Sequence, residues 1–323
     1  MSRFQYLQRV ISAYCLPGRS QLTFWHESPE AHPEYTPSAL GPYYMTFSSK
    51  ADYPGPFDPD GIPQLDYHGS IGLQYNPIAI AQYGLGNYNL YRGGSEPERR
   101  RKFLTAADWL VKNLEENSAG MPVWMHRFDF EYRTLLRAPW YSGLAQGQGI
   151  SLLVRAHQET SEDKYLDAAK RAFMPMTRSV NQGGVLFLDE HSRTWIEEYV
   201  VFPPTHILNG FIWGLWGVHD LFLVTRDPEA KRLWDESVKT LKESIGSYDA
   251  GFWSLYEHSG TRLRMIASRF YHSLHIVQLR ILHALTNEQI FADTAARWER
   301  YRASPWRRFR AQIQKICFKL LYY

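Results

Sequence analysis

The sequence lacks the motifs that mark most cofactor-dependent enzymes. It has no GxGxxG or Walker-type phosphate loop, no HExxH zinc motif, no GxSxG nucleophile elbow and no CxxC pair. These absences argue against nucleotide cofactors, zinc hydrolysis and serine or dithiol chemistry. We therefore expect neither a cofactor nor a metal, and any chemistry has to come from tyrosine, carboxylate, histidine and arginine side chains.

Cysteine and long apolar runs are also scarce. Cys15 and Cys317 lie near opposite ends of the chain, which suits neither a disulfide framework nor a metal-ligand set. We interpret them as free thiols. The N-terminal residues lack the apolar stretch of a secretory signal, and no run approaches the roughly 20 apolar residues that cross a bilayer. We expect a cytoplasmic protein that does not span a membrane.

The chain also lacks an excess of charge of either sign. The 36 basic and 33 acidic residues nearly cancel, so composition gives no reason to expect nucleic acid as a partner. The basic run at residues 98–102 precedes a predicted helix and is typical of a solvated face. What the chain has is 323 residues that are 44% hydrophobic, enough for one large globular core.

Two regions differ in pattern. Residues 15–70 are rich in Pro, Gly, Tyr and Ser and have little periodicity, so we predict an extended N-terminal arm over residues 1–65. From residue 76 onward, apolar residues recur at helical spacing. The predicted helices cover residues 76–90, 97–116, 141–159, 162–179, 206–225, 228–246, 271–286 and 288–302.

The predicted helices form four pairs. The first helix of the first three pairs is rich in small residues, and the polar residues Gln82, Gln146, Asn209 and Gln278 mark the first helices at spacings of 64, 63 and 69 residues. Such a repeat is typical of stacked helical hairpins. We predict a mainly α fold, an α/α toroid of about four helical hairpins over residues 66–303. A short β-hairpin element is expected within residues 248–264.

The last segment, residues 304–323, has five basic residues interleaved with aromatic and aliphatic ones at helical spacing. Two interpretations are open for this basic amphipathic tail. Its apolar stripe packs on the body of the protein, or it makes peripheral contact with an anionic membrane surface.

Three tyrosines, Tyr199, Tyr256 and Tyr271, lie near the loops that enter the inner helices, so a toroid would gather them at one rim. A phenol has a pKa near 10, and it becomes a useful base only if cations or hydrogen bonds stabilise the phenolate. Arg264 and Arg269 are near in sequence and are expected to supply that charge. A tyrosine site of this kind suits abstraction of a carbon-bound proton beside a carboxylate, as at C5 of a uronic acid.

Five segments in unbroken order are similar to one enzyme family. They are Tyr75–Leu85, Ala107–Val111, Trp140–Gln148, Glu197–Tyr199 with Leu208–Phe211, and Tyr271–His275. Together they resemble the catalytic domain of D-glucuronyl C5-epimerases, isomerases that convert glucuronate to iduronate within heparosan-type chains. The resemblance extends over about residues 65–303 and implies an α/α toroid and an anionic polysaccharide as substrate.

The resemblance also implies roles for individual residues. Tyr199, Tyr256, Tyr271 and Glu198 match the catalytic residues of the family, and Asn209 matches a substrate-contacting asparagine. On this basis Tyr271 and Glu198 are expected to exchange the C5 proton from opposite faces, with Tyr199 and Tyr256 assisting or positioning the sugar. Two alternatives stay open: a polyuronate lyase, which shares the first chemical step, and a carbohydrate-binding protein without chemistry.

The chain departs from the family after the middle tyrosine. A substrate-binding arginine of the family is replaced by His258 and Ser259, so Arg262 or Arg264 is expected to take over carboxylate binding. The β-rich domains that precede the toroid in the animal enzymes have only the arm in their place, and a homodimer is left open. The further substrate-binding candidates are Arg269, His272, Arg264, Tyr141, Gln146, Arg127 and Tyr75.

Overall fold

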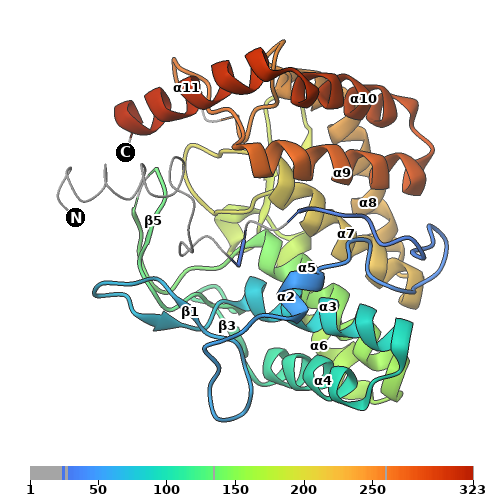
Figure 1. Ribbon diagram of the computed structural model, residues 1–323. Coiled ribbons are helices and arrows are strands. Elements are labelled where there is room, and N and C mark those ends of the chain that lie inside the picture. Colours follow the sequence, from blue (N-terminus) through green and yellow to red (C-terminus); the bar gives the residue numbers. More distant parts are fainter. Residues whose placement is uncertain (1–23, 26–27, 134, 259, 323) are drawn as a thin grey trace.

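A computed structural model describes residues 24–25, 28–133, 135–258 and 260–322. The fold is mainly helical, and the four predicted hairpins are confirmed as an α/α toroid (Figure 1). The hairpins are α3 (Pro77–Gly94) with α4 (Pro97–Lys112), α5 (Gly143–Thr160) with α6 (Asp163–Phe173), α7 (Leu208–Thr225) with α8 (Pro228–Ser244), and α9 (Arg269–Thr286) with α10 (Gln289–Ala303).

Small residues let the inner helices approach one another closely. A Cβ on Gly147 of α5 would lie 2.4 Å from the Cα of Gly214 on α7, and one on Gly217 would lie 2.1 Å from the Gly147 carbonyl oxygen. Side chains at these positions would force the two backbones apart. The outer helices α4, α6 and α8 each bury one stripe and expose the rest, which is the amphipathic pattern that the sequence predicts.

The inner helices begin at one rim of the ring. Asn76 caps α3, Ser142 caps α5 and Ser268 caps α9, because each side chain accepts a hydrogen bond from a backbone N–H of the first turn. Pro77 occupies the first turn of α3, where a missing N–H costs nothing. These caps fix where the rim loops end and where the inner helices start.

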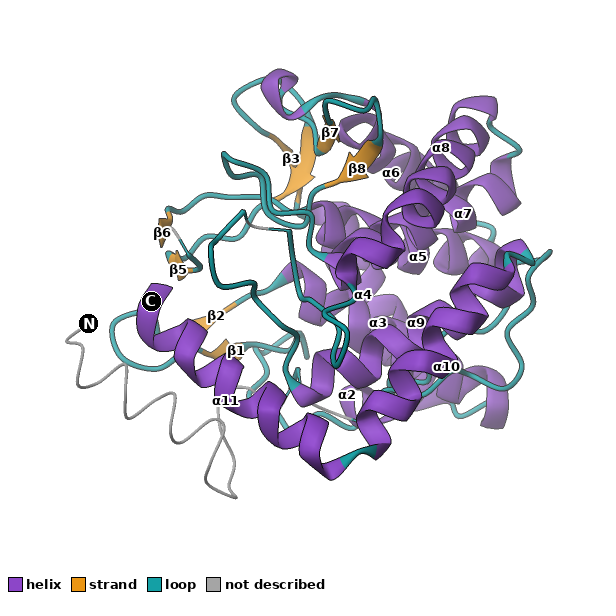
Figure 2. Ribbon diagram, turned by 90° about the horizontal axis from the view of Figure 1, so that it is seen from above, coloured by secondary structure: helices purple, strands orange, loops and turns teal. Residues whose placement is uncertain are grey.

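Four short antiparallel hairpins lie along the same rim, on one side of the helices (Figure 2). They are β1 (Leu65–Asp66) with β2 (Leu73–Gln74), β3 (Leu114–Glu116) with β4 (Pro122–Trp124), β5 (Phe130–Glu131) with β6 (Leu135–Leu136), and β7 (Leu186–Leu188) with β8 (Thr194–Ile196).

The small β-hairpins that the sequence predicts are present, but within residues 248–264 the pairing does not extend into named strands. The segment 249–266 makes only isolated bridges, Asp249 to Ser254 and Leu255 to Ile266. Its backbone bonds partly to itself, as from the Tyr256 N–H to the Met265 carbonyl, and partly to the loop before α7 and the start of that helix. The Tyr256 carbonyl, for example, accepts from the N–H of Leu208 at the start of α7. The segment is thereby held as a loop over the rim.

The described part of the N-terminal arm packs into the core. Helix α2 (Ser48–Ala51) lies on α3, and Tyr43, Tyr44 and Phe47 are buried. The Tyr44 hydroxyl donates to Asp220 over 2.7 Å, and that carboxylate also forms a buried ion pair of 2.6 Å with Arg155. Since these contacts involve the C-terminal halves of α5 and α7, this part of the arm packs at the end of the ring opposite the rim, whereas Trp25 and Leu65 lie at the rim itself. Residues 1–23, with Cys15, lie outside the described part.

The C-terminal tail forms helix α11 (Pro305–Tyr322), and it packs on the body as the first interpretation predicts. Ala311, Lys315 and Phe318 are buried on its inner side. Its outer side is apolar as well, because Trp306, Phe309, Ile313, Leu320 and Leu321 are exposed. Among the described helices, none combines the length and apolar character needed to cross a membrane.

Candidate active site

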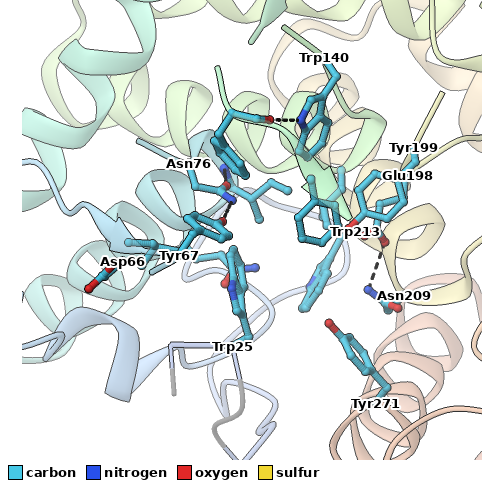
Figure 3. Close-up of a pocket in the computed structure, with 16 residues that line it drawn as sticks. Trp25, Asp66, Tyr67, Asn76, Trp140, Glu198, Tyr199, Asn209, Trp213 and Tyr271 are labelled. Atoms are coloured by element: carbon cyan, nitrogen blue, oxygen red, sulfur yellow. Dashed lines mark hydrogen bonds between the residues drawn. The ribbon is translucent and has the colours of Figure 1, made fainter. Parts of the chain in front are cut away.

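A cavity opens at the rim between the starts of the inner helices (Figure 3). Its empty space is about 850 Å³, which includes space open to solvent. It is lined by Trp25, Leu65, Asp66, Tyr67, Asn76, Ile78, Gln82, Phe128, Phe130, Trp140, Leu144, Glu198, Tyr199, Asn209, Trp213 and Tyr271. Four predicted site residues, Glu198, Tyr199, Asn209 and Tyr271, therefore lie together.

Glu198 faces this cavity, while its neighbour Glu197 does not. The Glu197 carboxylate accepts from the backbone N–H of His206 and contacts the His206 ring. Glu198 lies against Asn209, whose Nδ2 donates to Oε2 over 3.4 Å. The next residue, Gly210, makes room for it, since a Cβ there would lie 2.1 Å from Glu198 Oε2. The prediction of Glu198 rather than Glu197 as the inward carboxyl agrees with this geometry.

Burial raises the pKa of the Glu198 carboxyl to about 8. A hydrogen bond with Tyr199 opposes the shift, and the negative charges of Glu257 and Glu197 add to it. A carboxyl with a pKa near neutrality exchanges protons readily in either direction. The site thus holds a group suited to general acid–base chemistry, on the wall of a cavity.

The three tyrosines occupy different places around the cavity. Tyr199 and Tyr271 line it, and the Tyr271 hydroxyl is directed into the space that Glu198 and Asn209 also face (Figure 3). Tyr256 lies behind Tyr271, with the ring centres 4.8 Å apart in an edge-to-face arrangement. Tyr256 is buried and does not line the cavity, so its geometry suits support of Tyr271.

For Tyr199 and Tyr256, the expected lowering of the pKa by arginines is wrong. Burial, followed by the charge of Glu198, raises the pKa of both Tyr199 and Tyr256 well above 10. Arg264 and Arg269 are exposed, and the Arg269 guanidinium donates to Gln312 of α11 over 2.6 Å. Since Tyr199 and Tyr256 stay protonated at neutral pH, they can act as proton donors rather than as resting bases.

A second buried acid lies behind the tyrosines. Glu257, which is 1% exposed, accepts a short hydrogen bond from the Tyr132 hydroxyl and pairs with Arg133 at 3.2 Å. The Tyr132 ring lies 4.7 Å from that of Tyr199. Lys315 of α11 reaches the same region, with its Nζ 5.3 Å from the centre of the Tyr256 ring. The cluster connects the walls of the cavity to the C-terminal helix.

Two predicted substrate contacts are structural groups in the core. Gln146 is buried and bonds the backbone of Pro122, Trp124 and Ala172, which fixes β4 and α6 to α5. His272 is buried, its Nε2 contacting the Trp298 carbonyl, and burial lowers its pKa to about 3. Neither residue lines the cavity, because both side chains turn away from the rim into the helix packing.

The other predicted contacts lie outside the lining as well. Arg127 is exposed and pairs with Glu115 at 2.5 Å, and the Tyr75 hydroxyl donates to Asp58. Tyr141 is half-buried, with its hydroxyl near the Gly184 carbonyl. Arg264 is exposed on the rim loop, and its backbone carbonyl bonds α11. These residues remain predictions, with no contact to the cavity in this structure.

Several residues of the site were not predicted. Trp213, Asp66 and Tyr67 line the cavity, and Tyr132 and Glu257 stand behind it. One signal was available, since Trp213 falls in the small-residue helix that starts beside Asn209. The remaining residues come from loops and from the two-residue strand β1, which are too short or irregular for periodicity to show which way a side chain faces. Among the described residues, no group of three or more His, Cys, Asp or Glu is arranged to hold a metal ion.

Comparison with known proteins identifies relatives of this chain. The model of the family described as D-glucuronyl C5-epimerase C-terminus matches residues 117–300. A D-glucuronyl C5-epimerase of Caenorhabditis elegans is 31% identical over 214 residues, which are 62% of this chain and 34% of that protein. The match thus spans about a third of the worm protein.

Two further similarities extend over more of the chain. An uncharacterized protein of Methanocaldococcus jannaschii is 27% identical over 267 residues, covering 76% of this chain and 85% of the archaeal one. A family 76 glycoside hydrolase (mannosidase) from Bacteroides thetaiotaomicron has a similar fold, with a TM-score of 0.50, 13% identity and coverage of 90% of this chain and 83% of that one. At this identity the likeness shows the fold alone.

Proposed function

Since this chain belongs to the family of the D-glucuronyl C5-epimerase C-terminus, we propose that it is an isomerase that inverts C5 of glucuronate residues within an anionic polysaccharide. The observation that carries the proposal is the buried Glu198 carboxyl, which faces the Tyr271 phenol in one cavity at the toroid rim. Inversion needs a proton acceptor on one face of C5 and a proton donor on the other. The two residues are the pair proposed for these roles.

The proposed reaction starts with the ionised form of Glu198. Its carboxylate takes the proton from C5, and the electron pair of the broken C–H bond moves into the sugar carboxylate to give an enolate. Tyr271 then donates its phenolic proton to C5 from the opposite face. The neutral Glu198 and the Tyr271 phenolate exchange a proton through solvent, which restores the starting state. No oxidant or second substrate enters this cycle.

Neutral donors are proposed to stabilise the enolate. None of the described lining residues is Lys, Arg or His, whereas amide donors are present at Asn76, Gln82 and Asn209. Asn209 is best placed, because it already bonds the Glu198 carboxyl. Hydrogen-bond donors that are fixed in a protein wall stabilise developing negative charge more than freely reorienting water does.

Aromatic side chains are proposed to hold the sugar ring. Trp140 and Trp213 form part of the wall, and apolar ring faces are common contacts for the C–H faces of sugars. The cavity opens to solvent at the rim, so a polymer lying across the rim can place one residue inside.

One experiment tests the proposal against both alternatives. The protein is incubated in deuterated water with glucuronate-containing polymers, and the products are followed by NMR and ultraviolet absorbance. Deuterium at C5 together with iduronate signals is the expected result. Absorbing unsaturated chain ends would indicate elimination, and a polymer that binds without any exchange would indicate a carbohydrate-binding protein.

A further inference from the structure

Lys315 is a buried charged residue with no part in the reaction described above. It is 6% exposed, lies on the inner side of α11, and donates from Nζ to the Ile266 carbonyl over 2.9 Å. The same Nζ stands 5.3 Å from the centre of the Tyr256 ring. Lysine is rarely buried without a compensating partner, so its position calls for an explanation.

The compensating charge is Glu257, the residue after Tyr256. Burial lowers the pKa of Lys315 to about 8, and the negative charge of Glu257 opposes that shift. Glu257 also accepts from Tyr132 and pairs with Arg133. The ammonium therefore acts on two groups of tyrosines. It lies beside Tyr256, which packs behind Tyr271. Through the charge of Glu257 it also acts on Tyr132, which packs against Tyr199.

Helix α11 holds the whole loop that carries these groups. Gln314 donates to the Arg264 carbonyl over 3.1 Å, and the Leu263 N–H contacts the Tyr322 hydroxyl at 3.3 Å. The Arg310 guanidinium lies 3.9 Å from the centre of the Phe252 ring. Helix α11 thus crosses the segment between α8 and α9. It lies beyond residues 117–300, the part matched by the family model.

Resting on the proposed reaction, we propose that Lys315 is a positioning residue: its ammonium fixes the Tyr256 ring and the rim loop at Ile266 from behind and offsets the charge of Glu257, so that α11 is part of the active site. Without the ammonium, Glu257 would lose one of its cations in a buried setting, and the phenols beside it would face a less compensated negative charge. The Tyr256 ring would also lose a cation–π contact that fixes its position against Tyr271.

The proposal implies a pH dependence that belongs to Lys315. Its neighbours that titrate are Glu257 and Tyr256 on the rim loop and His275 on α9, whose pKa burial lowers far below neutrality, so that His275 stays uncharged. The Lys315 ammonium is present at pH 7 and is lost as the pH rises through about 8. An arginine at this position would stay charged throughout.

The test uses the full chain and the C5 deuterium exchange assay with a glucuronate polymer. Lys315→Met is expected to lower kcat by about tenfold or more with little change in KM, because the residue touches no substrate. Lys315→Arg is expected to retain activity and to extend it to higher pH. Lys319→Met, on the half-exposed side of the same helix, is the matched control and is expected to behave as the wild type.

A double-mutant cycle separates positioning from general stability. If Lys315 acts through Glu257, the effects of Lys315→Met and Glu257→Gln on kcat will be less than additive. A folded Lys315→Met variant with the kcat of the wild type would overturn this inference and leave the proposed function unaffected. If that variant does not fold, the test is the dependence of kcat on pH in Lys315→Arg. A dependence identical to that of the wild type would overturn the inference. Absence of exchange by the wild type would overturn the proposed function and this inference together.

Discussion

Asn209 Nδ2 lies 3.4 Å from Glu198 Oε2, and Gly210, the residue after that asparagine, leaves the space in which the carboxyl sits. A single turn at the start of α7 therefore supplies both a hydrogen-bond donor and a recess for one buried acid. The amide favours the ionised carboxyl, whereas burial favours the neutral one. Burial prevails, since the pKa of Glu198 is raised to about 8.

The first prediction concerns Glu198→Gln, which removes a carboxyl that is costly to ionise in the folded protein. The pKa of Glu198 is about 8 in the folded protein, above the usual value of 4.5. Folding therefore favours the neutral carboxyl, and the wild type has its full stability below about pH 4.5. That stability is lost as the pH rises through about 8. We expect the variant to gain about 2–5 kcal/mol relative to the wild type between pH 5 and pH 9. Urea unfolding at both pH values measures this difference.

The same variant should lose C5 exchange, since an amide cannot accept the proton. Glu243→Gln, at an exposed position on α8, is the control and should change neither activity nor the pH dependence of stability. A Glu198→Gln protein whose stability followed pH as the wild type does would show that Glu198 is not the group with the raised pKa.

The second prediction concerns Gly210→Ala. The added Cβ would lie 2.1 Å from Glu198 Oε2 and 2.6 Å from Glu198 Cβ, so Glu198 has to move away from Asn209. We expect loss of most C5 exchange in a protein that is destabilised by about 1–3 kcal/mol. Gly93→Ala provides the contrast, because nothing lies within 4 Å of its Cβ in α3, and it should stabilise by about 0.5–1 kcal/mol. Thermal unfolding and the exchange assay are run on both; equal activity of the two would contradict the prediction.

The third prediction concerns Tyr271→Phe, which deletes the proposed proton donor and keeps the ring that packs on Tyr256. We expect C5 exchange to fall by about 10²- to 10⁴-fold with little change in stability. Tyr91→Phe is the matched control, since that hydroxyl donates to Glu159 near the C-terminal ends of α3 and α5, away from the cavity. Normal exchange by the Tyr271 variant would remove Tyr271 from the mechanism and leave the Glu198 assignment untouched.

The helices could be predicted because their signals are local. Small residues such as Gly147 and Gly214 mark helices that must approach closely, and apolar residues recur at helical spacing along the chain. The predicted helix starts are accurate within a few residues, as at Leu208 of α7. The predicted end of α6 at residue 179 is less accurate, because a 3₁₀ turn, Met174–Thr177, follows the helix.

The site was predicted only where a residue lies next to a helix start or matches the family. Tyr199, Asn209 and Tyr271 satisfy that condition. Glu257 and Lys315 do not, because a buried carboxylate and a buried ammonium look like ordinary surface charges in the sequence, and only the docking of α11 on the rim loop brings them together. His272 was mispredicted for the opposite reason. It follows the proposed proton donor Tyr271, but its side chain turns inward and contacts the Trp298 carbonyl.

The fourth prediction concerns the outer side of α11, where the expectation of membrane contact stays open. Trp306 is 72% exposed, Phe309 55% and Leu321 70%, although α11 already buries another side on the body. No acidic residue occurs in residues 300–323, whereas Arg308 and Arg310 are exposed beside the apolar side chains. An apolar strip bordered by cations is complementary to an anionic lipid surface.

We expect the wild type to sediment with vesicles of anionic phospholipid and to release at high salt, and the double variant Phe309→Ser, Ile313→Ser to partition at least about tenfold less. Ile290→Ser, at an exposed apolar position on α10, is the control and should sediment as the wild type does. Because Lys315 and the inner side of α11 are untouched, C5 exchange on soluble polymer should be unchanged in the double variant. Equal sedimentation of all three proteins would show that the outer side of α11 does not bind lipid. An apparent mass that rises with protein concentration in analytical ultracentrifugation would show instead that this side binds a second copy of the chain.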